Sequence, residues 1–96
     1  MKMQIESGVY TIGPNKTNFK RFTVKFKNKF NSIPVFVANT LQDKDYLQDI
    51  PDTFAVSVKS ITENEAVVQV WKVSNPATSK SWGQNLRLCW IAMSED

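Results

Sequence analysis

Residues 20–27 read KRFTVKFK, and from Arg21 onwards polar and apolar side chains alternate. Because successive side chains of a β-strand point to opposite faces, this spacing places Phe22, Val24 and Phe26 on one face. The intervening Thr and Lys side chains lie on the other face, in water. The stretch therefore predicts a half-buried β-strand whose aromatic side belongs to the core.

Short runs of the same kind recur along the chain, separated by turn residues. Further strands are predicted near residues 9–12, 35–40, 54–59, 66–73 and 86–93. The run at 35–40 is apolar enough to be covered on both faces, and residues 62–65 read as a hairpin turn. The best helix candidate, residues 43–50, is interpreted as a loop. The pattern predicts an all-β fold, a six-stranded antiparallel β-sandwich made of two sheets.

The length of 96 residues predicts a single domain that spans residues 1–96. Hydrophobic residues make up 42% of the chain and aromatic residues 11%, which is typical of a globular domain and not of a disordered one. A domain of this size buries a modest share of its surface. We therefore expect several copies to assemble and so extend the core.

The net charge of +3 is unevenly distributed, because seven of the 12 Lys and Arg residues lie in residues 1–30, where Glu6 is the only acid. A basic segment attracts nucleic acid, but single strands are bound by rings that stand beside the cations. In residues 20–27 the rings and the cations lie on opposite faces. We interpret the charge as a solvated strand face and expect no nucleic-acid partner.

The residue types of most catalytic sites are missing. The chain has no His, the commonest general base and metal ligand at neutral pH. Its single cysteine, Cys89, lies in an apolar run and has no partner for an intrachain disulfide. The three glycines are far apart, so no phosphate-binding loop is present. We expect neither enzymatic activity nor a cofactor.

One stretch of the chain is acidic, as calcium-binding loops are; it contains Asp43, Asp45, Asp49 and Asp52. A loop of the EF-hand type counted from Asp43 requires Gly at position 48 and Glu at position 54. The chain has Gln48 and Phe54 there. We interpret the stretch as a solvated loop and expect no metal site, with an irregular calcium loop as the less favoured alternative.

The first ten residues lack the apolar segment of a signal peptide, and no stretch approaches the length of a membrane span. We therefore expect synthesis in the cytoplasm and no membrane span.

Trp71 is the candidate binding residue. It lies near the end of the strand at 66–73, on the face opposite Ala66, Val68 and Val70, and a polar segment separates it from Trp82. A Trp ring offers an apolar plate to the C–H face of a sugar, while short polar side chains bond its hydroxyl groups. The equal alternative is that both Trp side chains pack inside the fold or in an oligomer interface.

Five elements spaced along the chain resemble the H-type lectin domain: Glu6-Ser7-Gly8, Phe26 with Phe30 and Pro34-Val35, Phe54-Ala55-Val56, residues 67–71, and Leu88-Cys89-Trp90-Ile91-Ala92. This family includes snail agglutinins, the C-terminal domains of discoidins and small domains of phage tail proteins. The resemblance covers the chain from about Glu6 to Met93. It implies a six-stranded antiparallel β-sandwich that assembles as a trimer or hexamer, with sites for galactose or N-acetylgalactosamine between subunits.

The resemblance also assigns positions. The sugar-site Trp of the family corresponds to Trp71, its following His to Lys72, and an Arg on the preceding strand falls near Thr53. The loop that reaches across from the neighbouring subunit is shortened to residues 13–18. Replacing the Arg removes strong, oriented hydrogen bonds to a sugar. The segment after Trp71 is longer than is usual in the family and contributes Trp82.

These observations predict a carbohydrate-binding module whose partners are glycans and copies of itself. Its predicted ligand-binding residues are Trp71, Lys72, Thr53, Asn75, Trp82, Gln84 and Asn18. The alternative is a structural, adaptor or receptor-binding domain of a phage tail or baseplate, with the same trimeric fold and without the sugar specificity. Association with a virion, or release without a conventional signal, follows from this resemblance.

Overall fold

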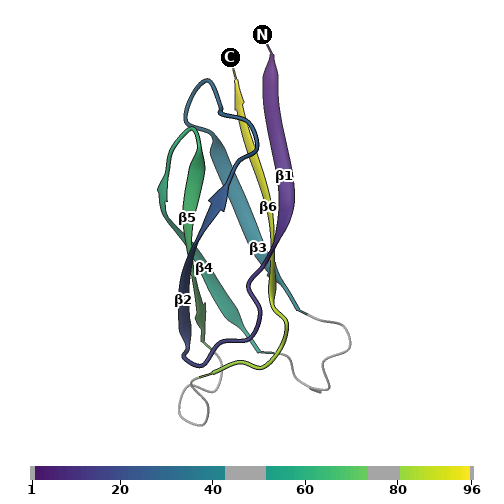
Figure 1. Ribbon diagram of the computed structural model, residues 1–96, viewed down its shortest axis with the longest axis vertical. Coiled ribbons are helices and arrows are strands. Elements are labelled where there is room, and N and C mark those ends of the chain that lie inside the picture. Colours follow the sequence, from purple (N-terminus) through teal and green to yellow (C-terminus); the bar gives the residue numbers. More distant parts are fainter. Residues whose placement is uncertain (1, 43–51, 74–80, 96) are drawn as a thin grey trace.

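The computed structural model describes residues 2–42, 52–73 and 81–95. They form six strands: β1 (Met3–Thr11), β2 (Phe19–Lys25), β3 (Val35–Leu41), β4 (Phe54–Ile61), β5 (Glu65–Lys72) and β6 (Arg87–Glu95). The strands make two antiparallel three-stranded sheets, ordered β1-β6-β3 and β2-β5-β4 (Figure 1). The described residues contain no helix, and none that could span a membrane. The prediction of an all-β fold with six antiparallel strands is confirmed.

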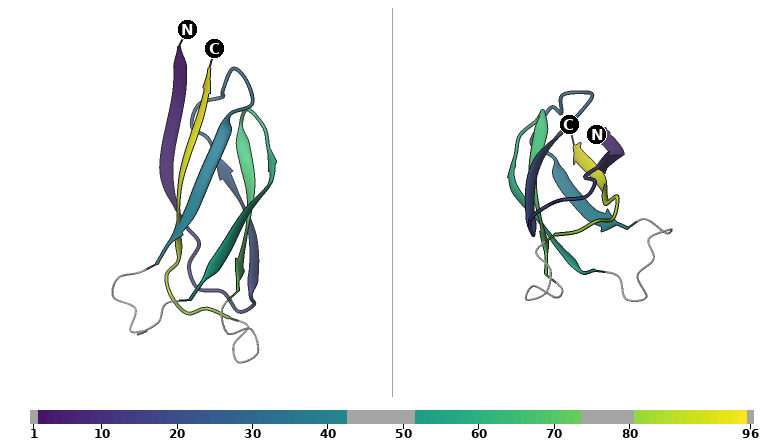
Figure 2. Two further views of the ribbon diagram at one scale, coloured as in Figure 1. Left: turned by 180° about the vertical axis from the view of Figure 1, so that it is seen from behind. Right: turned by 60° about the horizontal axis from the view of Figure 1, so that its bottom comes forward.

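The two sheets face each other and contribute to one hydrophobic core (Figure 2). Phe22 and Val24 are buried, as their alternation predicts, and Phe26 packs against the same core. Across the sheets, the ring of Tyr10 on β1 stacks on Phe22 of β2, with 4.5 Å between the ring centroids. On β5, the side chains predicted to share the inner face are fully buried: Ala66, Val68 and Val70.

Strand β1 is longer than predicted, because it begins at Met3 and not near residue 9. Its alternation is inverted in this part, with apolar side chains outward and polar ones toward the loop that follows β2. The Glu6 carboxylate accepts hydrogen bonds from the backbone N–H groups of Lys27, at 2.8 Å, and Asn28, at 3.2 Å. Gln4 bonds the same loop at Lys29 O and Asn31 N. These polar residues therefore hold a loop over the end of the core.

Strand β3 departs from its predicted environment. Residues 35–40 were expected to be covered on both faces, but in the single chain only the inner face is covered. Val35 is 63% exposed and Val37 54% exposed on the outer face. The prediction of double coverage is therefore wrong for the isolated chain.

Candidate functional site

Trp71 lies on the outer face of sheet β2-β5-β4, opposite Phe19 of β2. The two rings are tilted against each other with 4.9 Å between their centroids. The guanidinium group of Arg21 stands 5.6 Å from the centre of the Phe19 ring, and its Nε donates a hydrogen bond to Gln69 Oε1 at 3.0 Å. We call Phe19, Arg21, Gln69 and Trp71 the Trp71 cluster. It combines a half-buried aromatic pair with an oriented cation, a combination that suits stacking and charge-assisted hydrogen bonding.

The sequence identified only Trp71 of this cluster as a site residue. Alternation places Phe19 and Arg21 on one face of β2, but it does not reveal which strand lies next to β2. The pairing of β2 with β5 supplies that information, with Phe19 opposite Trp71 and Arg21 opposite Gln69.

Lys72 and Gln84 lie in a buried polar network. This network is at the end of the fold where β4 begins and β5 ends. Lys72 is 6% exposed, and its Nζ stands 3.7 Å from Asp52 Oδ1 and donates to Ser81 O at 3.0 Å. Gln84 is 1% exposed, and its Nε2 donates to Asp52 Oδ2 and to Gln42 Oε1. Burial costs these groups their hydration, and the bonds of Lys72, Asp52 and Gln84 Nε2 offset part of that loss, while the buried Gln84 Oε1 has no hydrogen-bond partner among the described residues. The network therefore serves to close this end of the fold.

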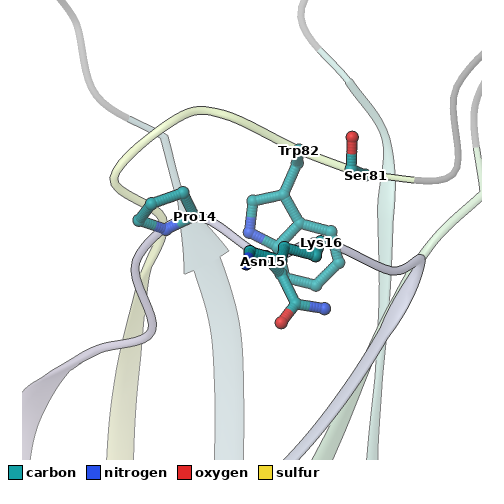
Figure 3. Close-up of a pocket in the computed structure, with 5 residues that line it drawn as sticks. All are labelled: Pro14, Asn15, Lys16, Ser81 and Trp82. Atoms are coloured by element: carbon teal, nitrogen blue, oxygen red, sulfur yellow. The ribbon is translucent and has the colours of Figure 1, made fainter.

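Trp82 is 3% exposed and packs in the core. Its Nε1 donates to Gly13 O at 2.8 Å, and its ring meets Phe54 edge-on with 5.2 Å between centroids. A surface pocket of about 380 Å³ adjoins it, lined by Pro14, Asn15, Lys16, Ser81 and Trp82 (Figure 3). The pocket is bordered by the backbone pairing of Asn15 with Trp82. Because so little of the indole is exposed, Trp82 does not offer a broad plate to a ligand.

The remaining predicted site residues lie near the same end. The backbone carbonyl of Asn18 accepts from Lys72 N, and that of Thr53 accepts from Val73 N. Both residues are exposed, whereas Asn75 lies outside the described residues. The fold thus brings Asn18, Thr53 and Trp71 to one end of a sheet. It turns Trp71 outward, while Lys72, Trp82 and Gln84 point inward.

The predicted loop of Asp residues is described only at Asp52, because residues 43–51 lie outside the described part of the chain. Asp52 is 7% exposed and bonds within the buried network. Among residues 2–42, 52–73 and 81–95 there is no group of three acidic or Cys side chains that could hold a metal ion.

The outer face of sheet β1-β6-β3 differs from the Trp71 side. Six large apolar side chains stand exposed there: Met3, Ile5, Val9, Val35, Val37 and Leu41. The middle strand adds three half-buried ones, Cys89, Ile91 and Met93. Ser7, Thr11 and Asn39 also lie on this face, between the apolar side chains. Single exposed apolar residues are normal on soluble proteins, whereas large exposed apolar patches are typical of interaction surfaces.

The chain is similar to known proteins in its fold. No protein-family model matches the chain, and no curated protein is similar to it in sequence. The N-truncated R1-type pyocin tail fiber has a similar structure, with a TM-score of 0.74 and 14% identity over 97% of this chain and 71% of that one. The tailspike of Pseudomonas phage phi297 has a TM-score of 0.71 and 14% identity, over 97% of this chain and 16% of that one. At this identity, what the chain shares with these proteins is the fold.

Proposed function

We propose that this chain is a structural module of a phage tail fibre or tailspike type of assembly, in which copies associate as a homotrimer. The two sheets form the six-stranded sandwich of each copy. The observation that carries the proposal is the apolar outer face of sheet β1-β6-β3, on a fold that resembles a tail fibre and a tailspike over 97% of the chain. An apolar face of this kind gains free energy when another surface removes it from water.

The proposal implies association with a virion, and it needs no catalytic residues. An assembly module needs surface complementarity and no reactive side chains, which agrees with a chain that lacks His. Closed cyclic assemblies are the common solution for identical subunits. They also enlarge the core of a small domain, whose own surface is large for its volume.

Light scattering behind size-exclusion chromatography tests the proposal on the full chain at micromolar concentration. The expected mass is three times the 11.0 kDa of one chain. Elution at the mass of one chain across this concentration range would contradict the proposal.

A second function, binding of a glycan of the galactose or N-acetylgalactosamine class, is favoured by the Trp71 cluster. Trp71 of β5 is half-buried next to Phe19 of β2. On its other side, it pairs with Ala55 of β4, which is small and exposed. The aromatic pair therefore has an open side, and Arg21 with Gln69 supplies polar groups beside it. The ligand would stack on the rings and accept hydrogen bonds from the guanidinium group.

Replacing Trp71 with Ala tests this second function. We expect glycan retention on an array to be lost while the oligomer survives, because Trp71 lies on an outer face and outside the buried core. Several sites per oligomer raise apparent affinity by roughly 10²–10⁴, so even a weak single site is detectable. Val67→Ala, on the outer face of the same strand, is the matched control. Unchanged glycan binding by Trp71→Ala, or no binding by the native protein, would rule this function out.

A further inference from the structure

Of the exposed cations on sheet β2-β5-β4, Arg21 is the one that other described side chains hold in place. Its guanidinium group stands over the Phe19 ring, 5.6 Å from the ring centre, and its Nε donates to Gln69 Oε1 at 3.0 Å. Lys25 and Lys59, the other exposed cations of these strands, have no side-chain partner among the described residues. Arg21 is therefore oriented in advance, which lowers the entropy lost when a ligand binds it.

The terminal nitrogens of Arg21 are available to a ligand. A guanidinium group has five N–H donors, and Gln69 takes the one on Nε. No described residue bonds Nη1 or Nη2. These two nitrogens form a planar fork, which is the shape that binds both oxygens of a carboxylate at once. The fork therefore fits a planar anion better than it fits the hydroxyl groups of a neutral sugar.

No acidic side chain of the sheet neutralises Arg21. Glu65 is the only acidic residue of strands β2, β5 and β4, and it pairs with Lys25 at the end of β2. Along β5, Glu65 lies four residues from Gln69, the partner of Arg21, which is about 13 Å at the usual rise per residue. The charge of Arg21 is therefore left for an anion from outside the sheet.

The aromatic pair beside Arg21 forms a single platform. The rings of Phe19 and Trp71 are tilted by 43° with 4.9 Å between their centroids, so they contact each other and no flat ligand fits between them. Single-stranded nucleic acid is held by stacking successive bases on several such rings. One platform with an open side at Ala55 instead favours one sugar ring, packed by its C–H face.

The platform and the fork are close enough to be joined by one sugar residue. Trp71 pairs with Phe19 and Gln69 pairs with Arg21, so Trp71 and Arg21 are diagonal neighbours of the β2-β5 pair. Diagonal neighbours lie about 7–8 Å apart, within reach of long side chains. A hexuronic acid carries its carboxylate on ring carbon C5. One such residue therefore presents both a ring for Trp71 and a planar anion for Arg21.

We infer that the Trp71 cluster binds an acidic saccharide, with a hexuronic acid ring on Trp71 and its carboxylate in the fork of Arg21 Nη1 and Nη2. The inference rests on the proposed glycan-binding function and names the ligand class, the uronic acid form of galactose in place of the neutral sugar. Phe19 and Gln69 act as positioning residues, because they hold the guanidinium group in the orientation that receives the anion.

The test compares two ligands that differ only at the carboxyl group, trigalacturonic acid and its methyl ester, by titration calorimetry on the native full-length protein. The ester keeps the rings and the hydroxyl groups but lacks the negative charge. We expect the acid to bind about 10- to 100-fold more tightly, which is the usual contribution of hydrogen bonds to a charged partner.

Arg21→Gln removes the fork and should bind the acid and the ester equally. Lys27→Gln is the matched control, because it removes the same charge from an exposed residue beyond the end of β2, outside the cluster. This control should keep the native preference for the acid. Circular dichroism checks that both variants remain folded. If Arg21→Gln unfolds, the comparison of acid and ester on the native protein decides the inference alone.

The outcomes separate this inference from the function on which it rests. Equal binding of the acid, the ester and neutral galactotriose by the native protein would overturn the inference and leave glycan binding standing. No binding of any of the three would overturn both. Loss of the preference in Lys27→Gln, or equally tight binding of dextran sulfate or a single-stranded oligonucleotide, would indicate diffuse attraction of anions to a basic face and would also overturn the inference.

Discussion

At the scale of single residues, Gly8 of β1 lies directly against the ring of Trp90 on the neighbouring strand β6. A Cβ atom at this position would stand 2.9 Å from Cζ2 of Trp90, closer than side chains normally allow. The Trp90 ring cannot easily move, because it packs against Phe26 and Phe36. We expect Gly8→Ala to lower the free energy of unfolding by about 1–3 kcal/mol, as overpacking does. Urea denaturation measures this effect, with Ser7→Ala as the control; a Gly8→Ala variant as stable as the native protein would disprove the close contact.

Lys72 and Asp52 provide the second residue-scale prediction. Removing one member of this buried ion pair takes the opposite charge away from the other, which keeps only its hydrogen bonds, such as those of Lys72 to Ser81 O and of Asp52 from Gln84 Nε2. Loss of the partner of a buried charge costs about 3–5 kcal/mol. Asp52→Ala and Lys72→Met should therefore each destabilise the fold strongly. The double variant should lose less than the sum of the two, because it removes both charges together. Additive losses in thermal or urea unfolding would show that the two side chains do not depend on each other.

At the scale of elements, the alternation of polar and apolar residues predicted the strands that have an apolar face in the core and a polar face in water. Strand β2 has its aromatic side in the core and its cations in water, and β5 buries every second residue. The first half of β1 was missed because Met3 and Ile5 point away from the core, while Gln4 and Glu6 point toward a loop. A pattern of alternation gives a period, but it does not state which face is inside.

The Glu6 contact gives an element-scale prediction. Its carboxylate accepts the backbone N–H groups of Lys27 and Asn28, so it orders the loop after β2. In Glu6→Ala these amides should exchange their hydrogen with solvent faster, while the amides of β5 stay protected. Ser7→Ala, which leaves the loop contacts in place, is the control. Unchanged exchange at Lys27 and Asn28 would mean that other contacts hold the loop.

The candidate site could be predicted only in part, because it depends on strand pairing. The outward orientation of Trp71 followed from alternation within its own strand. Its neighbours Phe19 and Arg21 come from a strand about 50 residues earlier, and only the register places them together. Trp82 and Lys72 were predicted as ligand contacts, yet the fold uses both to close the end of the core. A polar segment between two Trp residues does not reveal that burial.

At the scale of the whole molecule, the outer faces of the two sheets differ in polarity. The face of β2-β5-β4 is polar with one aromatic cluster, and the face of β1-β6-β3 is apolar. Assembly through the apolar face would leave the Trp71 cluster on the outside of every copy. Such an arrangement would allow a structural role and a ligand-binding role in one small module. The fold of the chain is similar to that of a pyocin tail fiber and a phage tailspike.

Association of copies of this chain through an apolar face can be measured by sedimentation equilibrium of the native protein at low and at high salt. Association through apolar surface does not weaken with ionic strength, whereas association through exposed charges does. We predict the mass of three chains from about 0.1 M to about 1 M NaCl. The mass of one chain at low salt, or a trimer that dissociates as salt rises, would show that the apolar face does not hold copies together.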